Sequence, residues 1–102
     1  LLSGADFIML DEPISNLDLV NQVKVLNILK NLSQQGLTIA IVLHDLNFAA
    51  KYGDVFIAIS KNKKIIYGEK NQVLNEKALS EIYGINFKVI SNEKDLFIQA
   101  VI

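Results

Sequence analysis

Two largely apolar runs, each followed directly by residues with reactive side chains, constrain the fold of this chain most. Residues 7–10 (FIML) end in Asp11-Glu12-Pro13, and residues 38–43 (TIAIVL) end in His44. Apolar runs without alternation are typical of strands buried on both faces, as in a parallel sheet. Pro13 has no N–H for a sheet ladder and stops the first run. The two runs therefore predict neighbouring parallel strands of an α/β domain.

The segment between these runs predicts a helix over residues 19–35. Its apolar residues recur mostly at steps of three and form one face: Leu19, Val20, Val23, Leu26, Leu29 and Leu32. Asp18 is suited to cap the start of this helix, and Gly36 to follow its end. Strand, helix and strand over this length form a βαβ unit with a right-handed crossover. Ligands of such sheets bind beyond the carboxyl ends of the strands.

The rest of the chain predicts short helices and antiparallel hairpins. We expect a helix over residues 46–52 capped by Asp45, and one over residues 76–83 capped by Asn75 and closed by Gly84. Residues 55–60 and 64–67 predict a hairpin whose turn places Asn62 in the left-handed region. Residues 87–90 and 96–102 predict a final hairpin, joined by the polar turn 91–95. No linker, repeat or low-complexity tract predicts an internal domain boundary.

Composition excludes several classes of function. The charged residues are ten Lys, no Arg and eleven acidic residues, and the net charge of −1 gives no case for binding nucleic acid or anionic lipid. Without Arg there is no Arg-based phosphate clamp on this chain. The absence of Cys excludes disulfides and thiolate chemistry, and a single His cannot form a His-rich metal site.

No segment of the sequence predicts membrane insertion or export. The apolar runs are far shorter than the roughly 20 residues that a membrane helix needs. No signal peptide is visible. The first residue is Leu, so we expect that processing or truncation has removed the natural start.

Asp11 and Glu12 are the strongest local indication of catalysis. Adjacent residues at a strand end point in different directions, so the two carboxylates are suited to different roles. Asp11 is suited to hold Mg²⁺ through water, because this ion keeps much of its hydration shell. Glu12 is suited to orient and activate an attacking water. The alternative is a solvated strand end followed by a turn, without function.

The order and spacing of several motifs resemble the second half of an ATP-binding cassette (ABC) nucleotide-binding domain. Asp11 matches the Walker B aspartate, Glu12 the catalytic glutamate beside it, and His44 the switch histidine that contacts the γ-phosphate. The D-loop is matched by Ser15, Asn16, Leu17 and Asp18. Asn16 and Ile14 depart from the family's commoner residues. The resemblance implies that Asp18 faces a partner domain across a dimer interface.

This resemblance implies that residues 1–102 are the C-terminal portion of a P-loop NTPase (RecA-like) ABC ATPase domain, in which parallel strands with a crossover helix are followed by antiparallel hairpins. The complete domain would use ATP and Mg²⁺, pair with a second nucleotide-binding domain and transmembrane permease subunits, and lie on the cytoplasmic face of the membrane. The Walker A, Q-loop and signature motifs are absent, and we interpret Leu2-Ser3-Gly4 as unrelated to the signature. We therefore expect the 102-residue chain alone to be inactive and to expose apolar surface.

A further resemblance indicates the type of transporter. Residues 43–47 (LHDLN), 73–74 (VL) and 79–85 (LSEIYGI) are similar to the importers of iron–siderophore, haem and cobalamin. Three alternatives stay open: a truncated, non-catalytic fragment; an ABC-type ATPase of DNA repair or chromosome maintenance, which would need coiled-coil insertions and basic surfaces; and a receiver-like phosphoacceptor domain, whose order of elements differs.

Overall fold

The computed structural model describes residues 6–102. Leu2, Ser3 and Gly4 lie outside the described residues. The chain forms two compact units, Leu1–His44 and Asp45–Ile102, although the sequence predicts no internal boundary. No Gly- or Pro-rich linker marks this junction, so composition gives no sign of it. No helix within residues 6–102 is long and apolar enough to cross a membrane.

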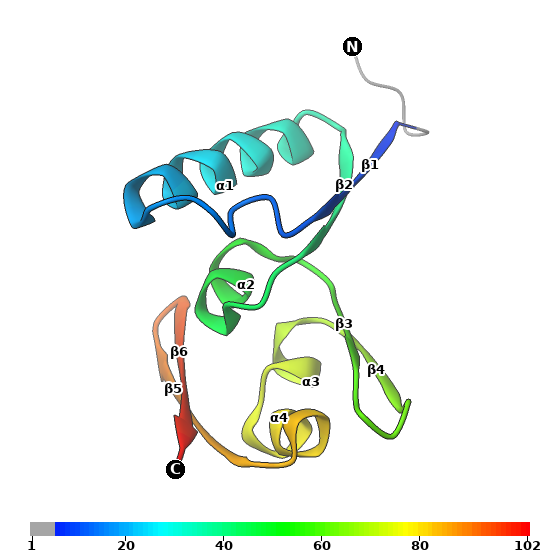
Figure 1. Cartoon of the computed structure of the whole chain (residues 1–102), viewed down its shortest axis with the longest axis vertical. Helices are drawn as coiled ribbons and strands as arrows, with labels where there is room; N and C mark the ends of the chain where they lie inside the picture. The colour runs from blue at the N-terminus through cyan, green and yellow to red at the C-terminus, as the bar shows by residue number, and fades with distance from the viewer. Residues whose placement is uncertain (1–5) are drawn as a thin grey trace. The chain divides into compact units, whose positions relative to one another are not determined.

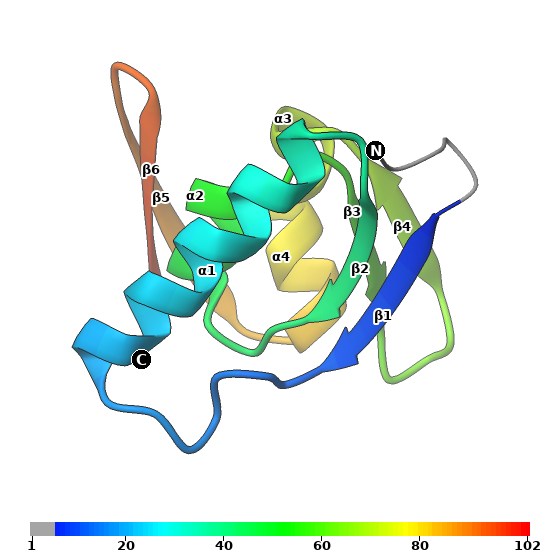
Figure 2. The ribbon, with the colours of Figure 1, turned by 90° about the horizontal axis from the view of Figure 1, so that it is seen from above.

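The first unit is a βαβ unit, as predicted. Its elements are β1 (Phe7–Asp11), α1 (Leu19–Gln34) and β2 (Thr38–Val42). The two strands pair in parallel, from Phe7 opposite Thr38 to Asp11 opposite Val42. Figures 1 and 2 show them side by side, with α1 along the pair. The register brings the carboxyl ends of both strands to the same edge.

Capping defines the ends of α1. The side chain of Asp18 accepts a hydrogen bond from the backbone N–H of Asn21 at 3.0 Å, which satisfies a donor that has no partner within the helix. Gly36 follows the helix with a φ of 110°, a conformation that glycine adopts without a steric penalty. Leu26, on the apolar face of the helix, is buried, as are Ile14 and Leu37. Both predicted ends of the helix are therefore confirmed.

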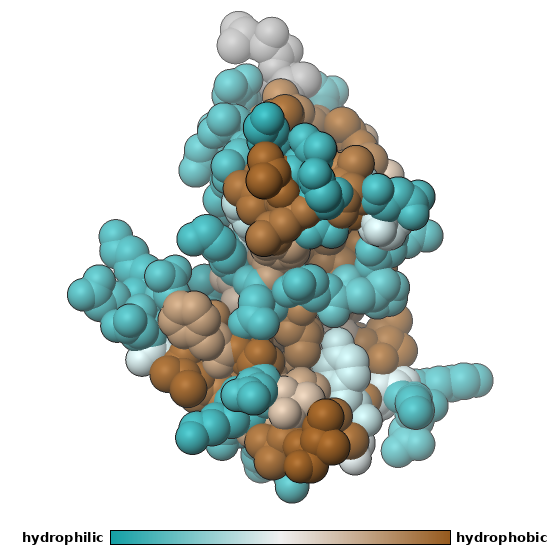
Figure 3. Space-filling view, turned by 60° about the vertical axis from the view of Figure 1, so that its left-hand side comes forward, coloured by the Kyte–Doolittle hydropathy of each residue, from teal (hydrophilic) through white to brown (hydrophobic). Residues whose placement is uncertain are grey.

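The strands of the first unit are much more exposed than predicted. Phe7 is 57% exposed, Met9 is 71% and Val42 is 47%. Among residues 6–44 of this unit the sheet has two strands, and these residues supply no further strand to cover its edges. The expectation of strands buried on both faces is wrong for this chain, whereas the expectation of exposed apolar surface is confirmed. Figure 3 shows apolar side chains at the surface in several places.

The second unit contains short helices and two antiparallel hairpins. Its elements are α2 (Leu46–Tyr52), β3 (Phe56–Ile59), β4 (Ile65–Gly68), α3 (Lys70–Val73), α4 (Glu76–Tyr83), β5 (Asn86–Asn92) and β6 (Asp95–Val101). Strand β3 pairs with β4, and β5 with β6. Both predicted hairpins are confirmed, although the strands of the second hairpin extend further into the predicted turn.

Side-chain caps explain where the helices of this unit begin. Asp45 Oδ1 accepts hydrogen bonds from the N–H groups of Asn47 and Phe48, at 2.9 and 3.0 Å. Asn75 Oδ1 accepts from Ala78 at 2.8 Å, and α4 ends at Gly84, whose φ is 76°. The caps predicted for α2 and α4 are confirmed.

Two local features of the second unit differ from the prediction. The left-handed residue of the first hairpin turn is Lys63, with a φ of 62°, and not Asn62. The N–H of Lys63 bonds to the carbonyl of Ser60 at 2.9 Å, and this turn geometry places the left-handed residue one position later. The sequence pattern did not indicate α3, which is a single turn. Its start is stabilised by Gln72 Oε1, which accepts from the N–H of Glu69 at 2.8 Å.

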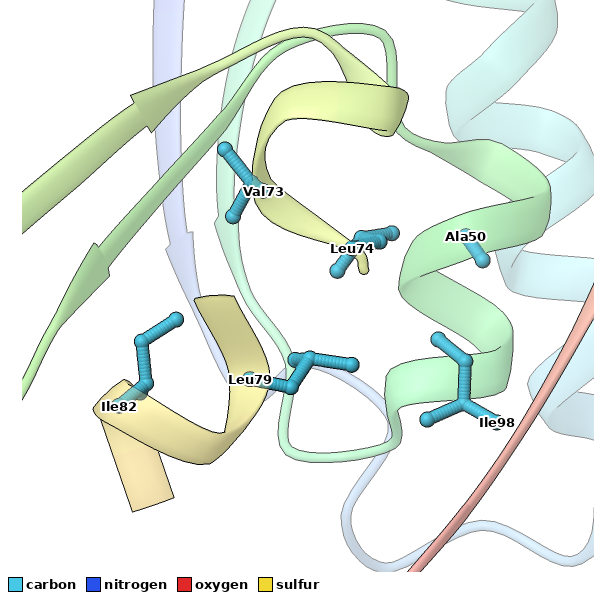
Figure 4. Close-up of a cluster of buried hydrophobic side chains, with 6 residues drawn as sticks. All are labelled: Ala50, Val73, Leu74, Leu79, Ile82 and Ile98. Atoms are coloured by element: carbon cyan, nitrogen blue, oxygen red, sulfur yellow. The ribbon is translucent and has the colours of Figure 1, made fainter. Parts of the chain in front are cut away.

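A small apolar core holds the second unit together. Figure 4 shows its members: Ala50, Val73, Leu74, Leu79, Ile82 and Ile98. Strand β6 is also joined to α2 by two polar bonds. The side-chain amide of Asn47 donates to the carbonyl of Ile98 at 3.1 Å, and its Oδ1 accepts from the N–H of Ile98 at 2.8 Å. Asn47 therefore pairs with the backbone of β6 as a neighbouring strand would.

Candidate functional site

The candidate site lies where β1 and β2 end together. The parallel register places Asp11 opposite Val42, and the N–H of Glu12 donates to the carbonyl of Val42 at 3.1 Å, one residue beyond the strand. His44 follows β2 after one further residue. The topology of the βαβ unit thus brings the predicted residues Asp11, Glu12 and His44 to one edge of the sheet, where ligands of α/β proteins bind.

Glu12 and His44 are in close contact. The Nε2 atom of His44 lies 3.1 Å from the Oε1 atom of Glu12, and the His44 side chain is 84% exposed whereas that of Glu12 is 22% exposed. This approach does not meet hydrogen-bond geometry, so Glu12 Oε1 is buried without a hydrogen-bond partner among the described residues. We therefore treat the contact as a close approach of two groups that become an ion pair when His44 is protonated. None of the described residues therefore fills the capacity of Glu12 Oε1 to accept a hydrogen bond.

The backbone of Glu12 is in an unfavourable conformation. Its φ of 51° lies in the left-handed region, which a non-glycine residue adopts at a cost of about 1–2 kcal/mol. The bond from its N–H to Val42, and a longer one from Ser15 N–H to the Glu12 carbonyl at 3.4 Å, help to hold this conformation. Such strained residues cluster at functional sites, where surrounding contacts fix them.

Asp11 fits a role as one ligand of a magnesium ion, but it does not form a complete site. It is exposed at the end of β1. Within residues 6–102 no group of three or more His, Asp or Glu side chains gathers to hold a metal. Mg²⁺ is often held by one or two carboxylates together with water and substrate phosphates. The single exposed carboxylate is compatible with that arrangement.

The predicted D-loop is an ordered turn between β1 and α1. Ser15 and Asn16 are exposed and Leu17 is partly buried. The N–H of Leu17 donates to the carbonyl of Ile14 at 3.2 Å, and Asp18 caps α1. The N-cap role of Asp18 is therefore confirmed, and its predicted role at a dimer interface stays a prediction.

Sequence reasoning missed two residues that organise this turn. Ile14, whose role the sequence did not explain, is only 4% exposed and anchors the turn. The side-chain amide of Gln22, in the first turn of α1, donates to the carbonyl of Ile14 at 3.1 Å. The only signal in the sequence is that Gln22 lies one helical turn after the cap Asp18, which is too common a pattern to indicate this contact.

A separate hollow of about 970 Å³ lies within the second unit, lined by residues of α3, α4 and the hairpin of β5 and β6. Charged side chains of both signs line it, among them Lys70, Lys77, Glu69 and Glu93. It contains none of the residues that the sequence predicts for catalysis.

The known proteins most relevant to this chain are import ATP-binding proteins. The petrobactin import ATP-binding protein YclP of Bacillus subtilis (strain 168) is 36% identical over 97 residues, which cover 92% of this chain and 38% of the relative. The hemin import ATP-binding protein HmuV of Photobacterium damselae subsp. damselae is 45% identical over 85 residues, which cover 83% of this chain and 32% of the relative. No protein-family model matches the chain.

A solved structure supports the same relationship. It is described as an inward-facing conformation of a metal-chelate type ABC transporter, and it matches with a TM-score of 0.78 and 27% identity over 94% of this chain and 39% of the other. This match confirms the predicted fold class, an α/β C-terminal part of a P-loop NTPase domain. The chain spans about a third of the length of the curated relatives, between 32% and 38%. The chain is therefore homologous to the ATP-binding subunits of ABC importers and corresponds to a C-terminal part of them.

Proposed function

We propose that this chain forms part of the ATP-hydrolysing subunit of an ABC importer, in which Glu12 is the general base and His44 stabilises the γ-phosphate. The observation that carries this proposal is the 3.1 Å approach of His44 Nε2 to Glu12 Oε1 at the carboxyl edge of the parallel strands. Phosphoryl transfer depends mainly on positioning and on charge stabilisation. A general base and a cationic hydrogen-bond donor held together at this edge can supply both positioning and charge stabilisation.

The two side chains have exposures suited to different roles. Glu12 is largely covered, but 22% of its side chain is exposed, so the carboxylate stays within reach of an attacking water whose proton it can accept. His44 is mostly exposed, so its imidazole is accessible to a phosphate group. Both ring nitrogens donate when the imidazole is protonated, which favours the negative charge of a transferring phosphoryl group.

Asp11 and the D-loop complete the proposed assignment. Asp11 would hold Mg²⁺ through water, and the bound ion would neutralise charge on the phosphates. Ser15, Asn16, Leu17 and Asp18 would face a second nucleotide-binding domain. The residues that grip the phosphates are not on this chain, because its sequence contains no G-x-x-x-x-G-K-[ST] motif. The 102-residue chain alone is therefore inactive in this proposal.

The relatives indicate the type of transport. They include import ATP-binding proteins for petrobactin, for hemin and, in Bacillus subtilis (strain 168), for iron(3+)-hydroxamate, the last being 34% identical over 95 residues. We propose that the complete subunit energises the uptake of an iron chelate, haem or cobalamin. In this proposal it binds transmembrane permease subunits at the cytoplasmic face of the membrane, and the solute contacts those subunits and not this chain.

Replacing Glu12 tests the proposal. In the complete subunit, Glu12→Gln keeps the size of the side chain but removes the proton acceptor, so turnover falls by about 10²–10⁴-fold while ATP binding is retained. Glu93→Gln, at an exposed position in the β5–β6 turn, is the matched control and keeps full turnover. Hydrolysis by the Glu12→Gln variant at a rate near that of the unsubstituted subunit would show that Glu12 is not the base.

A further inference from the structure

The segment between β1 and α1 carries the proposed base, and the backbone hydrogen bonds within it are local. Glu12 opens this segment in the left-handed conformation, with a φ of 51°. Within the segment, the carbonyl of Glu12 accepts from Ser15 at 3.4 Å and the carbonyl of Ile14 from Leu17 at 3.2 Å. Both bonds are local turns, and they do not connect the middle of the segment to a regular element.

Gln22 supplies such a connection from α1. Its side-chain amide donates to the carbonyl of Ile14 at 3.1 Å across eight positions of sequence. Its own backbone N–H bonds to the carbonyl of Asp18 at 2.9 Å, so the side chain projects from a fixed helical turn. Asp18 in turn caps that helix. Gln22 therefore ties the middle of the segment to the same helical turn that fixes its end.

The position of the accepting carbonyl gives this bond consequences for Glu12. Ile14 is only two residues beyond Glu12, and its burial at 4% exposure fixes the side chain. A residue in an unfavourable backbone conformation stays there only when its surroundings determine it more strongly than its own preference. The bond from Gln22 holds the chain two residues after Glu12, and the bond from the Glu12 N–H to the carbonyl of Val42 holds Glu12 itself at the end of β2.

We propose that Gln22 is a positioning residue, which holds the segment from Glu12 to Asp18 so that the Glu12 carboxylate stays in place against His44. This inference rests on the proposed function of Glu12 as the base. Gln22 acts on the reaction through the backbone of Ile14 and has no proposed contact with ATP or water.

Three substitutions separate this role from a purely structural one. Gln22→Met keeps the length and the packing of the side chain but removes the donor. Gln22→Glu keeps the shape and puts a carboxylate against the Ile14 carbonyl. Gln22→Lys restores a donor of sufficient reach. We expect kcat to fall about 10-fold in the Met variant and further in the Glu variant, because a small misplacement of a catalytic group has large effects on rate. The Lys variant regains most of the rate.

The measurement is steady-state ATP hydrolysis by the complete subunit assembled with its permease. We expect the KM for ATP to change less than about twofold, because the bond affects the transition state and not the binding of ATP. Gln34→Met, the same change at an exposed position of α1, is the control and leaves kcat unchanged. Hydrogen exchange reports the segment directly, and the amide of Leu17 exchanges roughly 2- to 10-fold faster in the Met variant, the range that matches loss of one hydrogen bond.

The outcomes distinguish this inference from the proposed function. If Glu12→Gln is inactive but Gln22→Met keeps full kcat and normal exchange at Leu17, the role of Gln22 is refuted and that of Glu12 stands. If Gln22→Met lowers the thermal midpoint while the folded protein keeps its kcat, Gln22 is structural only. If Glu12→Gln itself keeps full activity, the proposed function fails, and the exchange of Leu17 still shows whether Gln22 orders the segment.

Discussion

Glu12 and His44 lie just beyond the ends of two neighbouring parallel strands, and their side chains approach to 3.1 Å although only that of Glu12 is substantially covered by the protein. The contrast in exposure indicates which of the two side chains can be removed without disturbing the packing of the protein. A side chain that is 84% exposed contributes little to packing.

The exposure of His44 leads to a prediction for its removal. His44→Ala in the complete subunit should lower the free energy of unfolding by no more than about 1 kcal/mol, because no core contact is lost. The catalytic rate should fall strongly while ATP affinity changes little, because the contact to phosphate matters most in the transition state. Thermal denaturation and single-turnover hydrolysis on one preparation measure both. A large loss of stability, with activity falling only as the protein unfolds, would instead indicate a structural His44.

Asp18 caps α1 in the structure and has a proposed role at a dimer interface, and two substitutions separate these roles. Asp18→Ala removes the acceptor for the N–H of Asn21 and should destabilise the protein by about 1 kcal/mol. Asp18→Asn retains a capping oxygen and should keep stability. If the Asn variant is stable but hydrolyses ATP slowly, the charge of Asp18 acts beyond the cap. Equal activity of the Asn variant and the unsubstituted subunit would show that Asp18 only caps α1 and that its charge has no role in hydrolysis.

The two bonds between Asn47 and the backbone of Ile98 should contribute measurably to the second unit. Asn47→Ala leaves the N–H of Ile98 without its partner, and Ile98 is buried, so we expect a loss of about 1–3 kcal/mol in urea denaturation. Asn62→Ala, in the exposed turn of the β3–β4 hairpin, is the matched control and should change stability by less than about 0.5 kcal/mol. Equal stability of the two variants would show that the Asn47 bonds are dispensable.

The 102-residue chain alone should not bind Mg-ATP. Asp11, Glu12 and His44 act on phosphates that other residues must hold, and the sequence contains no G-x-x-x-x-G-K-[ST] motif. Calorimetric titration of the isolated chain with Mg-ATP should give no heat of binding, with circular dichroism as the check on its fold. Binding of Mg-ATP at micromolar affinity would contradict the proposal that residues outside this chain hold the phosphates.

Much of the local structure could be predicted because its causes are local. Asp18, Asp45 and Asn75 cap helices through their own side chains, and Gly84 ends α4 with a φ of 76°. Such signals need no knowledge of tertiary structure. The placement of Glu12 and His44 at the ends of neighbouring strands also followed from sequence, because a βαβ unit brings the ends of its strands to one edge. The contact between their side chains was not predicted.

The features that the sequence did not indicate depend on tertiary contacts or on turn geometry. The contact of Gln22 with Ile14 joins positions that no simple pattern relates. Whether Asn62 or Lys63 takes the left-handed conformation depends on the hydrogen bonds that close the hairpin turn, and in the structure it is Lys63. The exposure of Phe7 and Met9 reflects the number of strands in the sheet, which an apolar run cannot reveal.

The most direct test of the central claim, that Glu12 and His44 act as one catalytic unit, is a double-mutant cycle. Single-turnover rates are measured for Glu12→Gln, His44→Ala and the combined variant of the complete subunit under saturating Mg-ATP. Groups that act as a unit are strongly non-additive, so the combined variant should be no more than about threefold slower than the slower single variant. Rate losses that multiply in the combined variant, or a His44→Ala variant with an unchanged rate, would contradict the account.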